Sequence, residues 1–518
     1  MTVSPTALNS VPRPLDHLAE LAGEGGYGAA PALVLRDRVL NHDELRLRVD
    51  RIAGWLKREI GEPGARVATW AAKGELTCLM PLAAARAGLV HVPINPLLKR
   101  AQAAHILGDS GAVMVIGTGA RLASLEEGDL PAGCRSIEEA EALAITAQAG
   151  LSLGPSRANP DALTAILYTS GSTGRPKGVM LSHANLWLGA VSVAHYLTLE
   201  RDDVTLAVLP LSFDYGQNQL LSTWYAGGSV VPIDFLFPRD VAKACARHAI
   251  TTLAAVPPLW VQLTEIAWPA EASAPLRRLT NSGGALTADL VEDLRDIFPR
   301  ADLYPMYGLT EAFRSTYLEP ELVEKHPTSM GKAIPFAEIL VIDDDAGLAG
   351  PGEEGELVHC GPLVAHGYWQ DPARTAERFK PAPAASSYGG MAVWSGDRVR
   401  RDEDGLLYFV GRRDAMIKSA GNRISPQEIE EAAIASDLVS EAVALGVPDE
   451  RLGHAVHLVV RGSDDPEKRA HLAKLLKQEL PNFMQPQAIH WRDAMPLNPN
   501  GKIDRTALLR ELSEGGIA

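Results

Sequence analysis

The chain has 518 residues, in which 49 Lys and Arg stand against 64 Asp and Glu for a formal net charge of −15. At about 100–200 residues a domain, this length predicts roughly two to four domains. A hydrophobic share of 46% with 22% charged residues excludes disordered, collagenous and coiled-coil chains. The acidic balance argues against a nucleic-acid binder, because such proteins neutralise phosphates with clustered Lys and Arg.

The cysteines and the apolar runs indicate the compartment. The four cysteines include no CxxC pair, so neither a zinc knuckle nor a disulfide framework is expected. The first residues, Met1–Thr6, lack the basic start and apolar run of a signal peptide. The longest apolar stretch, Leu79–Ile94, contains Pro81, Arg86 and His91 and is too short to span a bilayer. We therefore expect a cytoplasmic protein with no membrane insertion.

Short apolar runs alternate with helical patterns through most of the chain, which predicts parallel βαβ units and an α/β fold. In chain order, the expected strands and helices include Ala165–Tyr168, Val179–Leu181, Val204–Leu211, Ser229–Ile233, helix Pro238–His248, Thr251–Val256, helix Leu286–Phe298 and Ala301–Tyr307.

The sequence changes character near residue 410. An apolar strand is expected at Leu406–Val410, and the charged run Gly411–Asp414 follows it directly. Two helical patterns, Pro426–Ser436 and Asp465–Leu480, come after this run. A boundary that is short and charged, without a Gly/Ser linker, is typical of a hinge. We therefore predict two units, residues 1–411 and 412–518, the second being of ordinary domain size.

A glycine- and hydroxyl-rich loop lies between two expected strands. Glycines allow backbone N–H groups to converge on one point, and hydroxyls and a lysine add donors, which suits triphosphate oxygens. Because Pro176 precedes the lysine, the loop is not a Walker A motif. The competing interpretation is a flexible surface turn. The candidate phosphate-binding residues are Thr169, Ser170, Gly171, Ser172, Thr173, Gly174 and Lys177.

This loop is one of an ordered set of motifs that covers the chain from about Leu15 to Arg510. In this set the chain resembles the adenylate-forming superfamily, which comprises acyl- and aryl-CoA ligases, adenylation domains of peptide synthetases, and luciferases. The other matching segments are Ala83–Pro96, Asn281–Ala285, Tyr307–Glu311, Gly355–Leu357, Gly367–Trp369, Trp394–Asp397, Gly411–Glu430 and Pro496–Lys502.

The resemblance implies a fold and a reaction. The implied fold has a large N-terminal domain of two helix-flanked mixed sheets plus a small β-barrel subdomain, followed by a small, mobile α+β C-terminal lid. The implied reaction is activation of a carboxylic acid by ATP to an acyl-adenylate, followed by transfer to a thiol with release of AMP. Because two anions meet in the first step, cations and dipoles must offset the developing charge.

Roles follow for individual residues by the same resemblance. The phosphate loop would hold the β- and γ-phosphates, Thr310 would contact the α-phosphate, and Glu311 would hold Mg²⁺, which prefers oxygen ligands. Lys502 is the expected catalytic cation. Asp397 would accept hydrogen bonds from the ribose, supported by Arg412. The remaining nucleotide contacts are expected from Gly283, Gly284, Ala285, Tyr307 and Gly308.

A hinge and a second catalytic face are also implied. Asp414 matches the hinge position, about which the C-terminal unit would pivot between the two half-reactions. Lys418 and Gly421 would then border the thiol tunnel in place of Lys502.

The expected acyl pocket leaves the substrate open. Phe213 and Asp214 resemble amino-acid-activating members, in which the aspartate binds the substrate ammonium. Arg314, helped by Ser282 and beside Gly308, would then bind a second carboxylate, and the substrate would be an acidic or β-amino acid. Alternatively, Asp214 and Arg314 neutralise each other and the substrate is an uncharged aliphatic or aryl acid, as in acyl-CoA ligases linked to exopolysaccharide export. A third interpretation makes Asp214 only a helix N-cap.

The acceptor and the other function classes complete the expectations. No carrier-protein serine motif is present, so CoA or the phosphopantetheine of a separate carrier protein would supply the thiol. A basic cluster near the expected thiol entrance would attract either one; it comprises Arg412, Arg413, Lys418 and Arg423. A non-enzymatic binding module, a luciferase-type oxygenase and a kinase are the alternatives from other classes.

Overall fold

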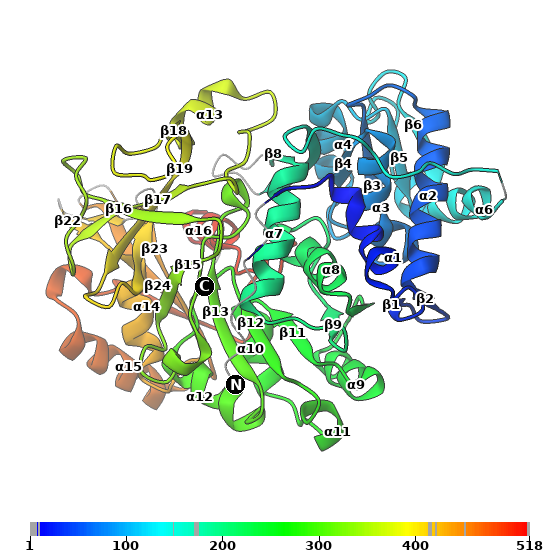
Figure 1. The fold of residues 1–518 in the computed structure, drawn as a ribbon. Helices are drawn as coiled ribbons and strands as arrows, with labels where there is room; N and C mark the ends of the chain where they lie inside the picture. The colour runs from blue at the N-terminus through cyan, green and yellow to red at the C-terminus, as the bar shows by residue number, and fades with distance from the viewer. Residues whose placement is uncertain are drawn as a thin grey trace.

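The structure is a computed structural model that describes residues 8, 11–148, 150–169, 176–412, 417–419, 422–449 and 452–514. Within these residues the strands form sheets of 14, six, three and two strands, with helices packed against them (Figure 1). The predicted α/β class is confirmed. None of the helices in the described ranges combines the length and apolar composition that a membrane crossing requires.

The six-stranded sheet is parallel except for its last strand, β8, which returns antiparallel to β7. Alternate side chains pack on opposite faces, as the two-residue period of a strand requires. Ala68 and Val115 pack with α4 on one face, whereas Val67 and Ile116 join the main core with α3 on the other. Its strands in spatial order are β6 (Arg135–Glu138), β5 (Met114–Gly117), β3 (Arg66–Trp70), β4 (Val90–Pro93), β7 (Leu163–Thr169) and β8 (Lys177–Ser182).

The 14-stranded sheet has a parallel part, β1 and β9 to β13, and an antiparallel part, β14 to β20, with β2 pairing antiparallel to β1. The antiparallel part corresponds to the expected barrel-like subdomain. The strands in spatial order are β16 (Glu338–Ile342), β17 (Glu354–Cys360), β19 (Met391–Arg401), β20 (Leu407–Arg412), β15 (Ser329–Ala333), β14 (Thr316–Tyr317), β13 (Asp302–Tyr307), β12 (Arg278–Asn281), β11 (Thr252–Ala255), β9 (Val204–Ala207), β10 (Ser229–Pro232), β1 (Pro31–Val34) and β2 (Val39–Asn41), while β18 (Phe379–Pro381) pairs with β19.

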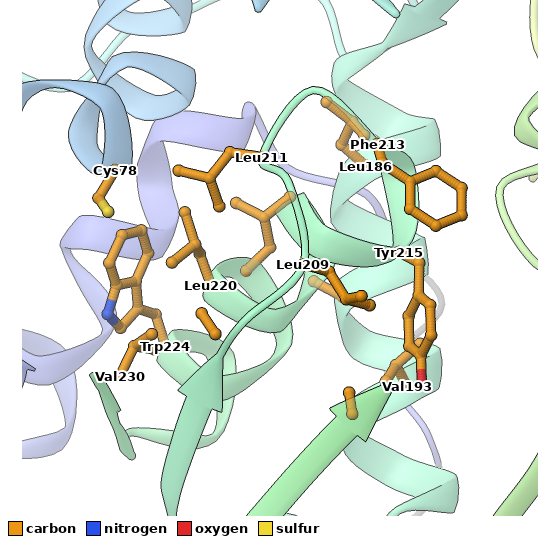
Figure 2. Packing of buried hydrophobic residues seen from close by; sticks show 14 of the residues in the cluster. Cys78, Leu186, Val193, Leu209, Leu211, Phe213, Tyr215, Leu220, Trp224 and Val230 are labelled. Carbon is orange, nitrogen blue, oxygen red and sulfur yellow. The ribbon is translucent and has the colours of Figure 1, made fainter. Parts of the chain in front are cut away.

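Helices α7 and α8 pack against each other between the two large sheets, and both are buried along most of their length. Figure 2 shows part of this core, with Trp224 beside Cys78 at one side and Phe213 and Tyr215 at the other. The helices up to residue 400 are η1 (Leu15–Ala19), α1 (Leu21–Gly25), α2 (His42–Glu59), α3 (Glu75–Ala87), α4 (Arg100–Ser110), α5 (Gly119–Leu122), α6 (Glu139–Ala147), α7 (His183–Tyr196), α8 (Asp214–Ala226), α9 (Pro238–His248), α10 (Pro257–Thr264), α11 (Ala270–Ser273), α12 (Ala288–Ile297), η2 (Thr310–Ala312), η3 (Pro320–Leu322) and α13 (Pro372–Arg378).

The C-terminal elements build their own core around a three-stranded sheet. Leu458 and its same-face neighbours pack on α14 and α15, whereas Val459 packs on α16 through Leu508. A division at residue 411 stays a prediction, supported by these separate clusters of residues beyond Ile417. The elements are β21 (Ile417–Ser419), β22 (Asn422–Ile424), α14 (Pro426–Ile434), β23 (Glu441–Asp449), β24 (Gly453–Arg461), α15 (Pro466–Glu479), η4 (Asn482–Met484), β25 (Ala488–Arg492) and α16 (Arg505–Ser513).

The expected elements are present, but several ends differ. The predicted strand Val204–Leu211 ends four residues early in β9, because its parallel partner β10 pairs only as far as Ala207. The apolar residues that follow, Val208, Leu209 and Leu211, are buried in the turn that leads into α8. Burial without strand pairing explains why the apolar pattern overestimates the strand.

A buried charge cluster fixes the start of the chain to α2 and α3. The Arg86 guanidinium, fully buried, donates to Asp16, to Asp50 and, at 2.5 Å, to Glu20. We expect Arg86→Met to lower the free energy of unfolding by about 3–5 kcal/mol, because it leaves buried carboxylates without their cation. Urea unfolding measures this loss. Arg58→Met, which removes an exposed cation, is the control and should cost less than about 1 kcal/mol. Equal effects of the two substitutions would contradict the role given to Arg86.

Candidate active site

The site lies where several parallel strands end. β9, β12 and β13 run side by side with β11 between the first two, and each leads at its carboxyl end into a predicted site segment. These segments begin at Phe213, Ser282 and Gly308. Ligands bind in this position in open α/β sheets, because the loops at the carboxyl ends of neighbouring parallel strands meet there.

Lys177 and Glu311 form the phosphate side of the site. The Lys177 ammonium donates to Glu311 at 3.0 Å and to the Tyr368 hydroxyl at 2.7 Å. Tyr368 in turn donates to the same carboxylate oxygen at 2.6 Å. Burial would raise the pKa of Glu311, but the Lys177 charge and the Tyr368 hydrogen bond hold that pKa below its ordinary value. Glu311 is therefore an ionised carboxylate beside the loop that begins at Thr169.

Glu311 has the chemistry of a magnesium ligand. Its Oε1 accepts both hydrogen bonds described above, whereas no side chain among the described residues donates to Oε2. Mg²⁺ is bound in proteins by one or two carboxylates together with substrate phosphates and water. A single ionised carboxylate with a second oxygen available fits that pattern.

Asp397 forms a second group of contacts in the site, with Tyr307 and Arg412. It is nearly fully buried on β19, accepts a hydrogen bond from the Tyr307 hydroxyl at 2.5 Å, and forms an ion pair with Arg412 Nε at 3.2 Å. Burial, reinforced by the Asp397 charge, raises the pKa of Tyr307 well above its ordinary value, so the phenol stays a donor. The structure thus brings together Tyr307, Asp397 and Arg412, as the sequence predicted.

Asp214 and Thr310 are joined directly. Asp214 is the first residue of α8, 6% exposed, and its Oδ1 accepts a hydrogen bond from the Thr310 hydroxyl at 2.9 Å. Burial raises the pKa of Asp214, while Arg314, the Thr310 hydrogen bond and Lys502 act in the opposite direction. Its second oxygen, Oδ2, accepts no hydrogen bond from the described residues and is available to a ligand.

Arg314 is a buried cation close enough to Asp214 to lower the pKa of that carboxyl. It is 2% exposed, and its guanidinium lies 4.5 Å from the centre of the Tyr215 ring. Its Nε has no hydrogen-bond partner among the described residues. The chain reaches Arg314 through Phe313, whose φ of 61° turns it sharply out of η2. A buried guanidinium is costly to desolvate unless an anion binds it, which identifies Arg314 as a candidate ligand contact.

Arg314 also lines a small cavity. Its lining includes Tyr215, Asn218 and Gln219 of α8. The side-chain oxygen of Asn218 and both amide atoms of Gln219 are buried without a partner in the described part of the chain. Tyr215 instead shares a 2.6 Å hydrogen bond with Thr280. Sequence analysis did not select Tyr368, Asn218 or Gln219; the four-residue helical spacing of Asn218 from Asp214 is the signal that could have found it.

Lys502 enters the site from the C-terminal elements. Its ammonium lies 4.8 Å from the centre of the Phe213 ring. A Cβ on Gly283, whose φ is 88°, would come within 2.5 Å of the Lys502 side chain, so glycine here leaves the passage open. The turn itself is held by Asn281, which donates to the Gly284 carbonyl at 2.9 Å. Burial lowers the pKa of Lys502, and the nearby Asp214 charge partly offsets this effect.

One of the open interpretations of Asp214, the helix N-cap, is wrong, while its neutralisation by Arg314 stays a prediction. The N-cap of α8 is Phe213, which makes no side-chain capping hydrogen bond, and Asp214 is already helical. Asp214 and Arg314 interact electrostatically but form no ion pair within 4.0 Å in the described part of the chain. Ser282 is buried and makes no hydrogen bond to Arg314 among the described residues, and its predicted contact with a substrate carboxylate stays a prediction.

Some predicted residues lie outside the described residues. These are Ser170, Gly171, Ser172, Thr173 and Gly174 of the loop, the hinge Asp414, Arg413 of the basic cluster, and Gly421 of the thiol face. Lys418 lies in β21, but its side chain, like that of Arg423, is not described.

Comparison with known proteins identifies the family. The profile of the AMP-binding enzyme family matches residues 4–369, and that of the AMP-binding enzyme C-terminal domain matches residues 428–502. The chain belongs to the AMP-binding enzyme family. It is an adenylate-forming ligase, which activates an acid with formation of AMP and transfers it to a carrier protein or CoA.

Among relatives, a ligase from Pseudomonas fluorescens named for joining L-proline to the L-prolyl-carrier protein is 32% identical, covering 94% of this chain and 97% of its own. Novobiocin biosynthesis protein H from Streptomyces niveus is 30% identical over 93% of this chain and 80% of its own. Tyrocidine synthase 3 from Brevibacillus parabrevis is 28% identical over 92% of this chain, which spans 7% of that much longer protein.

Solved structures share the fold over nearly the whole chain. ATP-bound MatB from Rhodopseudomonas palustris has a TM-score of 0.86 at 25% identity, covering 97% of this chain and 100% of that one. The o-succinylbenzoate CoA synthetase MenE from Bacillus subtilis, bound to its acyl-adenylate, has a TM-score of 0.82 at 25% identity, covering 96% and 98%.

Proposed function

We propose that the protein activates an amino acid, with an acidic or β-amino acid resembling aspartate as the best fit. The observation that carries this proposal is a pair of opposite buried charges, Asp214 and Arg314, that interact electrostatically without forming an ion pair among the described residues. Two buried charges that do not contact each other directly are costly unless a ligand completes their interactions. An ammonium at Asp214 and a second carboxylate at Arg314 would satisfy both.

The nucleotide side of the proposed site has its own roles. The loop from Thr169 to Lys177 would hold the β- and γ-phosphates, and Glu311 would hold Mg²⁺, which supplies positive charge to the phosphate oxygens. Tyr307 and Arg412 would orient Asp397, whose oxygens would accept hydrogen bonds from the ribose. The adenine would lie along the Gly283–Ala285 turn, beside Gly308.

The first half-reaction forms the acyl-adenylate. A carboxylate oxygen of the substrate bonds to the α-phosphorus, and the bond to the pyrophosphate oxygen breaks as pyrophosphate leaves. Lys502, with Thr310 on the opposite side, would offset the negative charge where the two anions meet. In the second half-reaction, the thiol sulfur bonds to the acyl carbon and AMP leaves. Phosphopantetheine on a carrier protein is the favoured acceptor, since relatives at 30% identity or more are named for carrier-protein loading.

The second candidate is an acyl-CoA ligase for an acid without an amine. The hydrogen bond from Thr310 to Asp214 favours it, because it gives the carboxylate one partner inside the protein. A structural neighbour named as a CoA synthetase, MenE from Bacillus subtilis, also supports it. In this case Arg314 would still bind an anionic end of the substrate.

ATP–pyrophosphate exchange separates the two candidates. The protein is assayed with a panel of amino acids matched to acids that lack only the amine, such as aspartate against succinate. We expect exchange with an acidic or β-amino acid and far less with its deaminated partner. Exchange with the deaminated acids alone would select the CoA ligase instead.

A substitution at Asp414 tests the proposed hinge. Proline fixes φ and restricts the preceding residue, so Asp414→Pro should oppose rotation about this position. We expect adenylate formation to stay within about twofold of the parent and thioester release to fall about tenfold or more, since lid motions commonly limit such steps. Single-turnover measurement of each half-reaction provides the check. Equal loss in both half-reactions would count against the hinge.

A further inference from the structure

The segment around Lys502 is anchored to the large part of the chain by contacts remote from the ammonium itself. One anchor lies near the loop tip, where Asn95 of the N-terminal part donates to the Pro499 carbonyl at 2.8 Å. The loop is stiffened by Asn498, whose side-chain oxygen accepts from the backbone N–H of Asn500 and Lys502. These contacts shape the loop but do not fix the C-terminal sheet from which it extends.

Arg461 makes the contact that reaches that sheet. It ends β24, and its Nε donates to the Asp493 carbonyl at 3.2 Å, at the start of the segment that leads to Lys502. Its Nη2 donates to both carboxylate oxygens of Glu265, in the large part of the chain, at 2.9 and 3.1 Å. A second carboxylate, Glu441 on β23, lies 3.6 Å from Nη1. Arg461 thus ties one segment of each part to the other.

Helix α10 connects this contact to the pocket. Glu265 directly follows the last residue of α10, and the helix begins at Pro257. Near that first turn, Cβ atoms placed on Gly283 and on Gly501 would both be within about 3.5 Å of Val256. The helix therefore has Arg461 at one end and the passage of Lys502 at the other.

Arg461 supplies the positive charge where the C-terminal elements meet the large part of the chain, a place referred to below as the junction. A cavity of about 340 Å³ separates the two parts here, lined by Ile266 on one side and Met495 on the other, so apolar packing does not close the junction. Glu265 and Glu441 repel each other, and burial together with that repulsion raises the pKa of Glu441 while Arg461 lowers it. Without the guanidinium, two carboxylates would face each other across an open junction.

We infer that Arg461 is a positioning residue for adenylate formation, which holds the C-terminal sheet against Glu265 so that Lys502 enters the pocket to the required depth. This inference rests on the proposed role of Lys502 in the first half-reaction. Arg461 acts through Lys502, since its own side-chain contacts among the described residues do not reach the pocket. Those contacts are with Glu265, Ser440, Glu441 and Asp493.

The test distinguishes an effect of Arg461 on the position of Lys502 from an effect on the stability of the fold. In Arg461→Ala, we expect kcat for ATP–pyrophosphate exchange to fall about tenfold, because a small displacement of a catalytic group is costly. KM for ATP and for the acid should change by less than about twofold, since neither substrate touches Arg461. Glu265→Gln should have the same type of effect, and Arg461→Lys should restore part of the rate. Arg469→Ala, which removes an exposed ion pair with Asp464, is the matched control and should leave the rate unchanged.

Two further measurements complete the design. Transfer of the acyl group from pre-formed adenylate to the thiol should be unchanged in Arg461→Ala, and so should the thermal midpoint. An unchanged exchange rate in this variant overturns the inference, and so does an equal loss in both half-reactions with a lowered midpoint. Lys502→Ala in parallel keeps the two proposals distinct. Parental exchange in Lys502→Ala contradicts the proposed function, whereas parental exchange in Arg461→Ala alone contradicts only the positioning role.

Discussion

Replacing Lys502 with alanine is expected to slow acyl-adenylate formation by about two to three orders of magnitude, the cost typical of losing one preorganised group that stabilises the transition state. The physical reason is that the substrate carboxylate and the α-phosphate repel each other. The Lys502 ammonium lies 4.8 Å from the centre of the Phe213 ring and interacts with the Asp214 charge, so in the proposed site it would offset this repulsion. ATP–pyrophosphate exchange measures this step directly.

The matched control is Lys477→Ala, an exposed lysine on α15 whose charge is the same and whose loss should leave exchange unchanged. Transfer from pre-formed adenylate to the thiol should also survive in Lys502→Ala, because that step requires no attack on the phosphate. If both variants exchange at the parental rate, Lys502 is not the catalytic cation.

Replacing Asp214 with asparagine should abolish activation of amine-bearing acids while sparing acids without an amine. Removing one partner of a buried, hydrogen-bonded charge pair costs about 2–5 kcal/mol, which corresponds to about 30-fold to several-thousand-fold in kcat/KM. Asparagine keeps the size of the side chain and an oxygen for the Thr310 hydroxyl, so the effect isolates the charge. Exchange kinetics with aspartate and succinate provide the comparison.

Arg314→Gln is the complementary variant. It removes the buried cation over Tyr215 and should reduce activation of acids with a second carboxylate, whereas a neutral amino acid should lose much less. Opposite selectivities of the Asp214 and Arg314 variants would establish which charged group of the substrate each residue binds. Identical losses for every acid in both variants would mean that the two residues only maintain the pocket.

Much of the site could be predicted from the sequence because its motifs are local. Thr310 and Glu311 follow β13 within a few residues, and Lys177 begins β8, so each motif is placed by the strand beside it. The contacts of Lys502 with the pocket required the whole chain to fold. They were expected only because the complete set of motifs resembles a known superfamily.

The separation of Asp214 and Arg314 could not be predicted. It depends on how α8 packs against the turn after β13, and on the left-handed backbone of Phe313 that sends Arg314 onto the Tyr215 ring. The residue types alone are equally compatible with a direct ion pair between Asp214 and Arg314. Tyr368 is a similar case, since its hydrogen bond to Glu311 joins residues 57 positions apart on different segments.

The mass of the acyl-adenylate that the protein forms tests the central claim most directly. The protein is incubated with ATP, Mg²⁺ and an equimolar mixture of amino acids and their deaminated counterparts, with no thiol present, and the bound adenylate is identified by mass spectrometry after rapid desalting. The account predicts an aminoacyl-adenylate with an acidic or β-amino acyl group. An adenylate formed only from an acid without an amine would contradict the assignment of Asp214 as the ammonium-binding residue.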